Sequence, residues 1–296
     1  MVARTVSDSA LRSARLGIVG TGVMAEAMLA GLLGKGLIDA RNVVASHPRG
    51  ERREQLERTH GISTTDDNAI AARGADVLLL AVKPQMLAAV ADELHGALPP
   101  EQLVISVIAG ASTVALSQTL EHPAVVRSMP NTPAQIGQGV TVWYATDAVD
   151  AQGKVRTRAM LSALGREFEV HDERQVAMAT AVSGTGPTYI FLFIEALTDA
   201  AVHLGFPRHV ARELVLDTMQ GSAAFALASG KHVAELRDMV TSPGGTSAEA
   251  LYQLERGRLR TVVSDAVWAA FERTLRLEAT LEHRPLDDEP RRGRRG

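Results

Sequence analysis

The chain of 296 residues contains no cysteine. Disulfides, thiolate metal sites and cysteine nucleophiles are therefore excluded. The nine histidines show no paired spacing of the kind that binds zinc, so no metal site is expected. The motifs G-x-S-x-G of serine hydrolases and G-x-x-x-x-G-K-[ST] of phosphate-binding loops are also absent. Any catalysis by this chain has to rest on other groups.

Long hydrophobic runs and charge of one sign are scarce as well. No run reaches the roughly 18 uninterrupted apolar residues of a membrane span. Residues 1–15 lack the apolar core of a secretory signal, and we interpret them as a disordered extension of a cytoplasmic protein, with a transit peptide as the alternative. The net charge of −3, with both signs mixed, argues against a nucleic-acid surface. The basic residues 283–296 read as a disordered tail, although an interaction role for that tail is a rival interpretation.

The first half of the chain alternates short apolar, β-branched runs with helical patterns. This alternation is typical of a parallel sheet with helices on both faces, and it extends over residues 16–172. The run 75–82 is apolar at nearly every position, as expected for a central strand that is buried on both sides. The expected strands are Leu16–Gly20, Asn42–Ser46, Ala75–Val82, Leu103–Ala109, Ala124–Arg127, Val140–Tyr144 and Glu167–Val170.

Residues 173–282 form a second region in which strand signals stop and helix follows helix. Breaks are expected at 183–187, 205–207, 229–231 and 241–245, where glycine or proline interrupts the pattern. The helix that begins near Pro187 is apolar almost all round, so it must be surrounded by protein. We interpret it as the centre of an oligomer, with a buried central helix of a monomer as the alternative.

A glycine motif opens the first region. Gly20, Gly22 and Ala25 fit G-x-G-x-x-G/A directly after a strand and before a helix. The first glycine permits a tight turn, the second admits a pyrophosphate, and the small third residue lets helix pack on strand. The N-terminus of the helix then offers free N–H groups to the phosphates. The motif predicts an α/β Rossmann domain, doubly wound with a mostly parallel sheet.

The end of the second strand indicates which dinucleotide binds. NAD-binding proteins usually have an acidic residue there for the ribose hydroxyls, but residues 42–50 contain no carboxylate. Ser46 and Arg49 are present instead, and arginine pairs bidentately with phosphate oxygens. We therefore expect NADP rather than NAD. Arg52 and Arg53 are equally consistent with a solvated start of a helix.

Two further strand ends suggest where the nicotinamide would lie. Lys83 and Pro84 follow the central strand, and small residues follow the strand that ends near residue 109. Asn131 and Thr132 lie between two prolines that fix the backbone. The fixed backbone would direct the Asn131 amide, or the carbonyls beside it, at a carboxamide ligand. Ligands of open α/β sheets bind at this edge, so together the segments predict a cofactor cleft.

The helical region contains one anion-binding pattern. Residues 242–247, Ser-Pro-Gly-Gly-Thr-Ser, lead into a helix that starts near Thr246. Two glycines before a helix expose backbone N–H groups, which form a nest for an anion. Ser247 and Thr246 add hydroxyl groups. A simple capping turn would give the same pattern.

Five segments in order resemble pyrroline-5-carboxylate reductase, the last enzyme of proline biosynthesis. They are GIVGTGVMAEA, LAVKPQ, SMPNTP, SGTGPTYIFLFIEALTDAAVHLGFPR and MVTSPGGTSAEALYQLE. The resemblance implies reduction of (S)-1-pyrroline-5-carboxylate to L-proline with NADPH, or with NADH. It also implies a Rossmann domain followed by an all-α dimerisation domain that interlocks two subunits, often within a decamer.

The resemblance also assigns site residues. The segment Val19–Met24 would hold the pyrophosphate, Ser46 and Arg49 would face the adenosine 2′ side, and Asn68 would contact the adenosine. The family usually has threonine at the position of Ser247, which keeps the hydroxyl and loses a methyl group. The full expected cofactor set is Val19, Gly20, Thr21, Gly22, Val23, Met24, Ser46, Arg49, Asn68, Ala81, Val82, Lys83, Pro84, Val107, Ile108, Ala109 and Asn131, and the substrate carboxylate would bind Gly244, Gly245, Thr246 and Ser247.

Positioning of a protonated cyclic imine against the nicotinamide is the expected catalytic contribution. Ser247 is the candidate to form a hydrogen bond with the ring nitrogen or to relay its proton. Two rival functions stay open. One is another NADP-linked imine or β-hydroxyacid reductase, which would have a catalytic lysine or aspartate on the long helix, where this chain has only Glu195 and Asp199. The other is a non-catalytic NADP(H)-binding oligomeric protein, which would need no second anion site.

Overall fold

The computed structural model describes residues 10–282, and the two terminal segments that the sequence predicts to be disordered lie mostly outside this range. The described chain divides into two compact units. One unit is Gly186–Ala269, and the other joins residues 10–185 to residues 270–282. Residues 173–185 and 270–282, which the sequence predicts to belong to the second region, therefore lie in the unit that holds the sheet.

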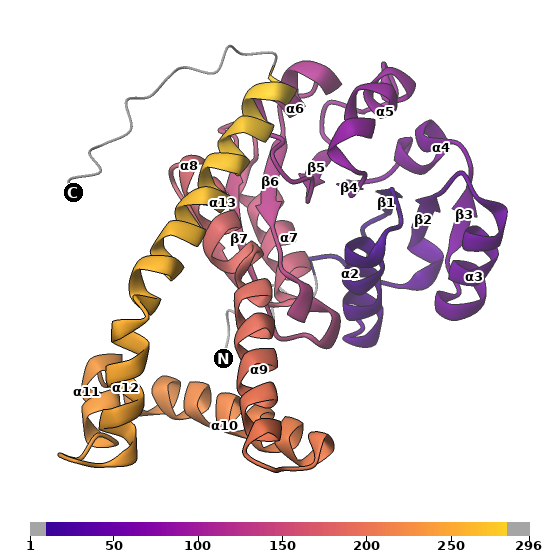
Figure 1. Ribbon diagram of the computed structural model, residues 1–296. Coiled ribbons are helices and arrows are strands. Elements are labelled where there is room, and N and C mark those ends of the chain that lie inside the picture. Colours follow the sequence, from indigo (N-terminus) through magenta and orange to yellow (C-terminus); the bar gives the residue numbers. More distant parts are fainter. Residues whose placement is uncertain (1–9, 283–296) are drawn as a thin grey trace. The chain divides into compact units, whose positions relative to one another are not determined.

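The sheet of the first unit confirms the predicted fold class. Its eight strands lie in the order β3-β2-β1-β4-β5-β6-β7-β8 (Figure 1). Strands β1 to β6 are parallel in the order of a Rossmann sheet, and β7 runs antiparallel to β6. The strands are β1 Leu16–Val19, β2 Val43–Ser46, β3 Ser63–Thr65, β4 Val77–Leu80, β5 Leu103–Ser106, β6 Val125–Met129, β7 Gly139–Ala145 and β8 Gly165–Glu169.

Strand β3 is the one strand that the sequence pattern missed. It has three residues, Ser-Thr-Thr, and none is fully buried. Short polar strands of this kind occur at sheet edges, where one side has no neighbour and little apolar surface is needed. The central strands β1, β4 and β5 are buried at every position, which is why their apolar runs were recognisable.

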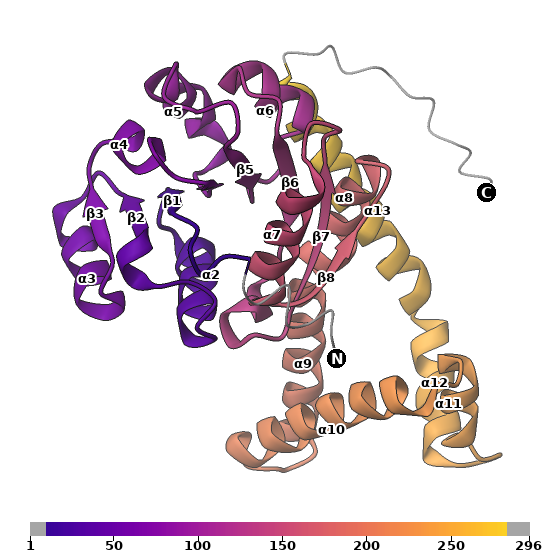
Figure 2. The same cartoon turned by 180° about the vertical axis from the view of Figure 1, so that it is seen from behind.

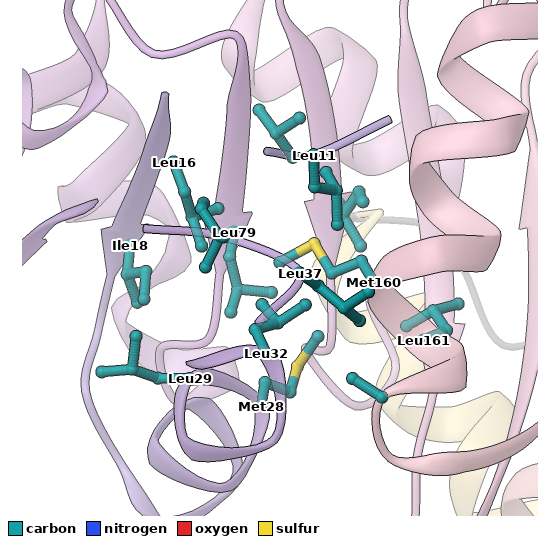
Figure 3. Close-up of a cluster of buried hydrophobic side chains, with 14 of the residues drawn as sticks. Leu11, Leu16, Ile18, Met28, Leu29, Leu32, Leu37, Leu79, Met160 and Leu161 are labelled. Carbon is teal, nitrogen blue, oxygen red and sulfur yellow. The ribbon is translucent and has the colours of Figure 1, made fainter. Parts of the chain in front are cut away.

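Two hydrophobic cores lie on the two faces of this sheet. Helices cover both faces (Figure 2). One core joins the sheet to α2 Val23–Gly34, α3 Gly50–His60 and α7 Ala151–Ser162, with Met28, Leu32 and Met160 near its centre (Figure 3). The other core joins the opposite face to α4 Asn68–Ala72, α5 Leu87–Leu94 and α6 Thr113–Leu120. The sheet is therefore the middle layer of three, as the parallel strands require.

Residues 10–15 correct part of the disorder predicted for the N-terminal extension. Leu11 is 2% exposed and Ala14 is 3% exposed, and both belong to the core that contains α2. The N–H of Arg15 donates to Asp76 at 2.8 Å just before β1. The extension supplies apolar surface to the core, so its last residues are part of the folded unit.

The expected break at 183–187 takes an unusual form. The helix α8, Arg174–Ala179, passes into a π-helical turn, Thr180–Gly184, instead of a loop. The N–H of Thr185 bonds the carbonyl of Thr180 at 2.8 Å, which is the five-residue spacing of a π turn. Single π turns occur frequently at functional sites. This turn directly precedes the second unit.

The second unit is entirely helical within the described residues. It consists of α9 Gly186–His203, α10 Arg208–Ser229, α11 Val233–Met239, α12 Thr246–Arg256 and the first half of α13 Leu259–Leu281. The breaks predicted at 205–207, 229–231 and 241–245 all separate these helices. Few of its side chains are buried within the chain.

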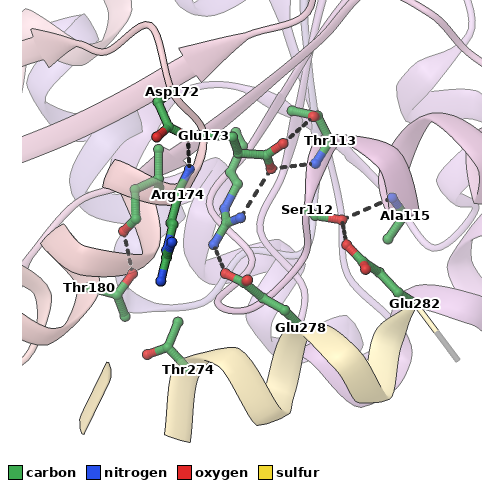
Figure 4. Close-up of polar contacts among 12 residues, drawn as sticks. Ser112, Thr113, Ala115, Asp172, Glu173, Arg174, Thr180, Thr274, Glu278 and Glu282 are labelled. Atoms are coloured by element: carbon green, nitrogen blue, oxygen red, sulfur yellow. Dashed lines mark hydrogen bonds and ion pairs between the residues drawn. The ribbon is translucent and has the colours of Figure 1, made fainter. Parts of the chain in front are cut away.

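A buried ion-pair cluster ties α8 and the end of α13 to the sheet (Figure 4). Arg127 of β6 has a side chain that is 4% exposed, and it pairs with Glu173 at 3.0 Å and with Glu278 of α13. Glu173 also accepts hydrogen bonds from the N–H and the hydroxyl of Thr113. Glu282, one turn beyond Glu278, bonds Ser112. One arginine therefore fixes three elements that are far apart in the sequence.

The substitution Arg127→Met tests this cluster. It leaves two carboxylates buried without their cation, so we expect a loss of about 3 kcal/mol in the free energy of unfolding. The matched control is Arg276→Met, because Arg276 forms an exposed pair with Glu272 on the same helix and should cost less than about 0.5 kcal/mol. Denaturant titration measures both, and equal losses would show that the cluster is not the anchor.

Candidate functional site

The carboxyl ends of the parallel strands form one row across the sheet. The strand register pairs Val19 with Ser46 on one side and with Leu80 on the other, and Leu80 pairs with Ser106. Most of the predicted cofactor residues directly follow this row. The structure thus brings together segments 19–24, 46–49, 81–84 and 107–109, which the sequence predicted as one cleft edge.

The glycine turn at the centre of this row has the geometry that a bound dinucleotide needs. Gly20 has φ +87°, and a side chain there would approach Val82 within 2.7 Å. A Cβ on Gly22 would meet no atom within 4 Å, so this side of the turn is open. No side chain caps the start of α2, and its N-terminal N–H groups are free for an anion. These features fit a pyrophosphate.

One polar atom at the turn is also without a partner. The hydroxyl of Thr21 is buried and makes no hydrogen bond within the described chain. Buried polar groups are normally satisfied, so this hydroxyl is available to donate a hydrogen bond to a phosphate. Together with the open face of Gly22, it agrees with the predicted pyrophosphate site.

Arg52 holds the glycine turn from the side, a role that sequence reasoning missed. Its guanidinium donates to the carbonyl of Thr21 at 3.2 Å and to Glu26 of α2 at 2.6 Å. Glu26 also contacts His60 at 3.2 Å. The hydrogen bond from Arg52, opposed by partial burial and assisted by His60, holds the pKa of Glu26 below its usual range. Arg52 is thus committed to the protein, not to solvent.

At the end of β2, the structure brings Ser46 and Asn68 together. Ser46 is 1% exposed, and its hydroxyl lies 2.6 Å from the Oδ1 of Asn68 and 3.3 Å from the carbonyl of Ile18. The Asn68 amide also donates to Glu93. The hydroxyl of Ser46 therefore links β1, β2 and α4.

Arg49 differs from its two neighbouring arginines. Arg53 donates to the carbonyls of His47 and Pro48, and Arg52 is paired as described. The Arg49 side chain is exposed and has no hydrogen bond or ion pair among the described residues. It is the guanidinium of this loop that is free to bind a phosphate.

The predicted cofactor residues that follow β4 and β5, at the same edge of the sheet, differ in how far their side chains are exposed. Lys83 is exposed and precedes the short 3₁₀ turn Pro84–Met86. Val107 and Ala109 are partly exposed, whereas Ile108 is 3% exposed and belongs to the core. A ligand at this edge would therefore meet Val107 and Ala109 rather than the Ile108 side chain.

Asn131 has its amide engaged within the chain. Its Nδ2 donates to the carbonyl of Ser183 in the π turn at 3.1 Å, and its Oδ1 accepts from the N–H of Val140 at 2.9 Å. The expected contact of the amide with a carboxamide would compete with these bonds. The carbonyls next to it remain the better candidates.

In the second unit, the segment predicted to bind an anion forms the turn that leads into α12. Gly244 has φ +71°, and Gly245 precedes the helix without any side-chain cap. The N–H of Gly245 is used by the turn, since it bonds the carbonyl of Ser242 at 3.0 Å. The hydroxyls of Thr246 and Ser247 have no partner among the described residues. An anion here would meet the first N–H groups of α12 and these hydroxyls.

The helix α9 exposes large apolar side chains in the single chain. Phe191 is 60% exposed and Leu192 is 65% exposed. By length and composition the stretch Arg174–His203 would be able to cross a membrane, although one such helix is weak evidence. An apolar helix that a partner subunit covers passes the same test. No group of three or more metal-binding side chains occurs among residues 10–282.

The sheet and its glycine turn define the class of protein, a dinucleotide-dependent oxidoreductase. Residues 15–110 match the family model described as "NADP oxidoreductase coenzyme F420-dependent". Residues 173–277 match the model described as "Pyrroline-5-carboxylate reductase dimerisation". The second match supports an oligomer.

Relatives over nearly the whole length identify the family. The chain is 40% identical to the pyrroline-5-carboxylate reductases of Synechocystis and Pseudomonas aeruginosa, over 90% of this chain and 98% of each relative. A solved pyrroline carboxylate reductase of Plasmodium falciparum with NADP bound matches with a TM-score of 0.83 and 30% identity, over 90% of this chain and 99% of the other. The chain belongs to the pyrroline-5-carboxylate reductase family.

The Arg52–Glu26 pair predicts a pH dependence of stability. Because the folded pKa of Glu26 is lowered, its contribution is present above the unfolded value of about 4.5 and is lost as the pH falls through the folded pKa. Glu26→Gln should reduce the free energy of unfolding by about 0.5–1 kcal/mol at pH 7. The deficit relative to the unsubstituted protein should shrink below pH 4.5.

Glu54→Gln is the matched control, since Glu54 forms an exposed pair with Arg58 at 3.7 Å on α3. It should change the free energy of unfolding by a smaller amount at every pH. A deficit for Glu26→Gln that stays constant from pH 7 to pH 4 would contradict the assignment.

Proposed function

We propose that this chain reduces (S)-1-pyrroline-5-carboxylate to L-proline, with NADPH as the preferred reductant and NADH as a weaker one. The main support is the similarity to curated reductases over 98% of their length. Both predicted anion sites lie inside matched regions, the glycine turn in residues 15–110 and the nest in residues 173–277. A relative of known structure has NADP bound.

In this proposal, Val19–Met24 hold the pyrophosphate, and Arg49 binds the 2′-phosphate beside Ser46. Ala81–Pro84 and Val107–Ala109 line the ribose and nicotinamide side. Bound NADPH supplies the hydride. The N–H groups and hydroxyls of Thr246 and Ser247 orient the substrate carboxylate, and the Ser247 hydroxyl forms a hydrogen bond with the ring N–H or relays its proton.

The proposal also covers assembly, domain limits and location. We infer a homodimer built through the helical domain, with higher assembly to a decamer. The exposed apolar residues of α9 support the dimer. We assign residues 16–172 to the NADP-binding domain and residues 173–282 to the substrate and dimerisation domain. A cytoplasmic location agrees with the absence of cysteine.

NADPH oxidation with a panel of substrates tests the function. Pyrroline-5-carboxylate should give a kcat/KM far above that of keto acids and of other cyclic imines. A higher value with a β-hydroxyacid or another imine would favour a different NADP-linked reductase. Dinucleotide binding without turnover of any panel member would favour a non-catalytic NADP(H)-binding protein.

Replacement of Arg49 tests the choice of dinucleotide. Arg49→Ala should weaken NADPH binding by about 1.5–3 kcal/mol, because it removes a charge-assisted hydrogen bond to phosphate. NADH binding should stay within about two-fold. Arg58→Ala is a control on the same helix, because Arg58 is exposed at the far end. Equal losses for both dinucleotides would show that Arg49 does not bind the 2′-phosphate.

Replacement of Ser247 tests the substrate nest. Ser247→Ala should lower kcat/KM for pyrroline-5-carboxylate about 10- to 150-fold, the equivalent of one hydrogen bond to a charged group. NADPH affinity in a direct binding assay should not change. Ser264→Ala, on α13, serves as the control, and thermal melting verifies that both variants fold.

The nest assignment is wrong if Ser247→Ala keeps its full kcat/KM or loses NADPH affinity in parallel. Gly245→Val should be more damaging than Ser247→Ala. A Cβ at this position would lie 2.5 Å from the Ser242 hydroxyl oxygen, so the turn before α12 would have to shift.

A further inference from the structure

His47 occupies the position directly after Ser46, at the carboxyl end of β2. Its backbone N–H bonds the carbonyl of Thr65 at the end of β3 at 3.0 Å. Its Nδ1 accepts the backbone N–H of Arg49 at 3.1 Å. The half-buried ring is therefore held against the start of α3, and its Nε2 has no partner among the described residues.

The surroundings of the ring are cationic. Arg49, Arg52 and Arg53 all lie close enough to repel a positive charge on His47. Burial, followed by these guanidiniums, lowers the pKa of His47 below its usual 6.5. A ring nitrogen that accepts an N–H also carries no proton. In the free protein His47 is thus neutral near pH 7.

Few negative groups offset this charge. Glu26 on α2 is committed to Arg52 at 2.6 Å, and Asp66 after β3 lies 3.8 Å from Arg53. Glu51 in the first turn of α3 is exposed. The start of α3 has no side-chain cap, so its free N–H groups add to the positive potential. The site attracts a compact dianion.

We propose that His47 binds the 2′-phosphate of NADP together with Arg49, and that Nδ1 of its imidazole takes up a proton from solvent when this phosphate binds. This proton replaces the hydrogen bond that Nδ1 accepts from the Arg49 N–H, and that N–H then turns to the phosphate. The inference rests on the proposed use of NADPH. A phosphate dianion beside the ring stabilises the imidazolium form. NADH has no 2′-phosphate and therefore cannot stabilise it. By linkage, proton uptake on binding makes the affinity for NADPH fall as the pH rises.

The consequence is a selectivity that depends on pH. The ratio of NADH to NADPH dissociation constants should rise about 3- to 10-fold between pH 8 and pH 6.5 in the unsubstituted protein. The window stays above pH 6 because the phosphate itself takes up a proton near that value. In His47→Asn, the ratio should be flatter over the same range.

The direct experiment uses adenosine 2′,5′-bisphosphate and adenosine 5′-monophosphate as probes. NMR titration of labelled histidine side chains in the full-length protein should show that the bisphosphate raises the pKa of His47 and that the monophosphate does not. His95→Asn is the control variant, because His95 is an exposed histidine in the turn after α5. It should keep the pH dependence of the unsubstituted protein.

The outcomes separate the two proposals. If the bisphosphate binds no more tightly than the monophosphate, there is no 2′-phosphate site, and both NADPH preference and the role of His47 fall. If the bisphosphate binds more tightly but the His47 resonances do not shift their pKa, and His47→Asn matches the unsubstituted protein at every pH, only the role of His47 is overturned.

Discussion

The buried pairing of Arg127 with two carboxylates is the constraint on which the arrangement of the first unit depends. Removing an arginine and two glutamates from water is costly, and the pairing compensates only when the geometry is good. Glu173 stands at the start of α8 and Glu278 near the end of α13. The chain leaves the sheet-bearing unit after residue 185 and returns to it at residue 270, so both glutamates lie inside this unit, one before the exit and one after the return.

Two close contacts reinforce that constraint. Gly110 follows β5 with φ +76°, and a side chain there would come within 2.8 Å of Leu277 on α13. Asn131 bonds the π turn that precedes Gly186. Both residues lie in loops that follow strands at the carboxyl edge of the sheet. The loops at this edge therefore contact the segments through which the chain leaves and re-enters the sheet-bearing unit. The dinucleotide-binding turn lies at the same edge.

The sequence predicted most of this fold because the central strands are apolar and the glycine spacing is specific. It also predicted which strand ends lie together, since parallel strands place their carboxyl ends on one edge. It could not predict the partners of Arg127, which lie 46 and 151 residues away. An arginine inside the apolar run of β6 was the available signal. The commitment of Arg52 to Thr21, and of the Asn131 amide to Ser183, likewise depends on contacts that only the folded chain reveals.

We propose that the chain transfers a hydride from a nicotinamide to a cyclic imine. Mass spectrometry of the product made from pyrroline-5-carboxylate and NADPH with both C4 hydrogens of the nicotinamide replaced by deuterium tests this transfer. The account predicts proline with one deuterium, located on the ring carbon that formed the C=N bond. Unlabelled proline, or no proline while a keto acid in the same mixture gains the label, would contradict it.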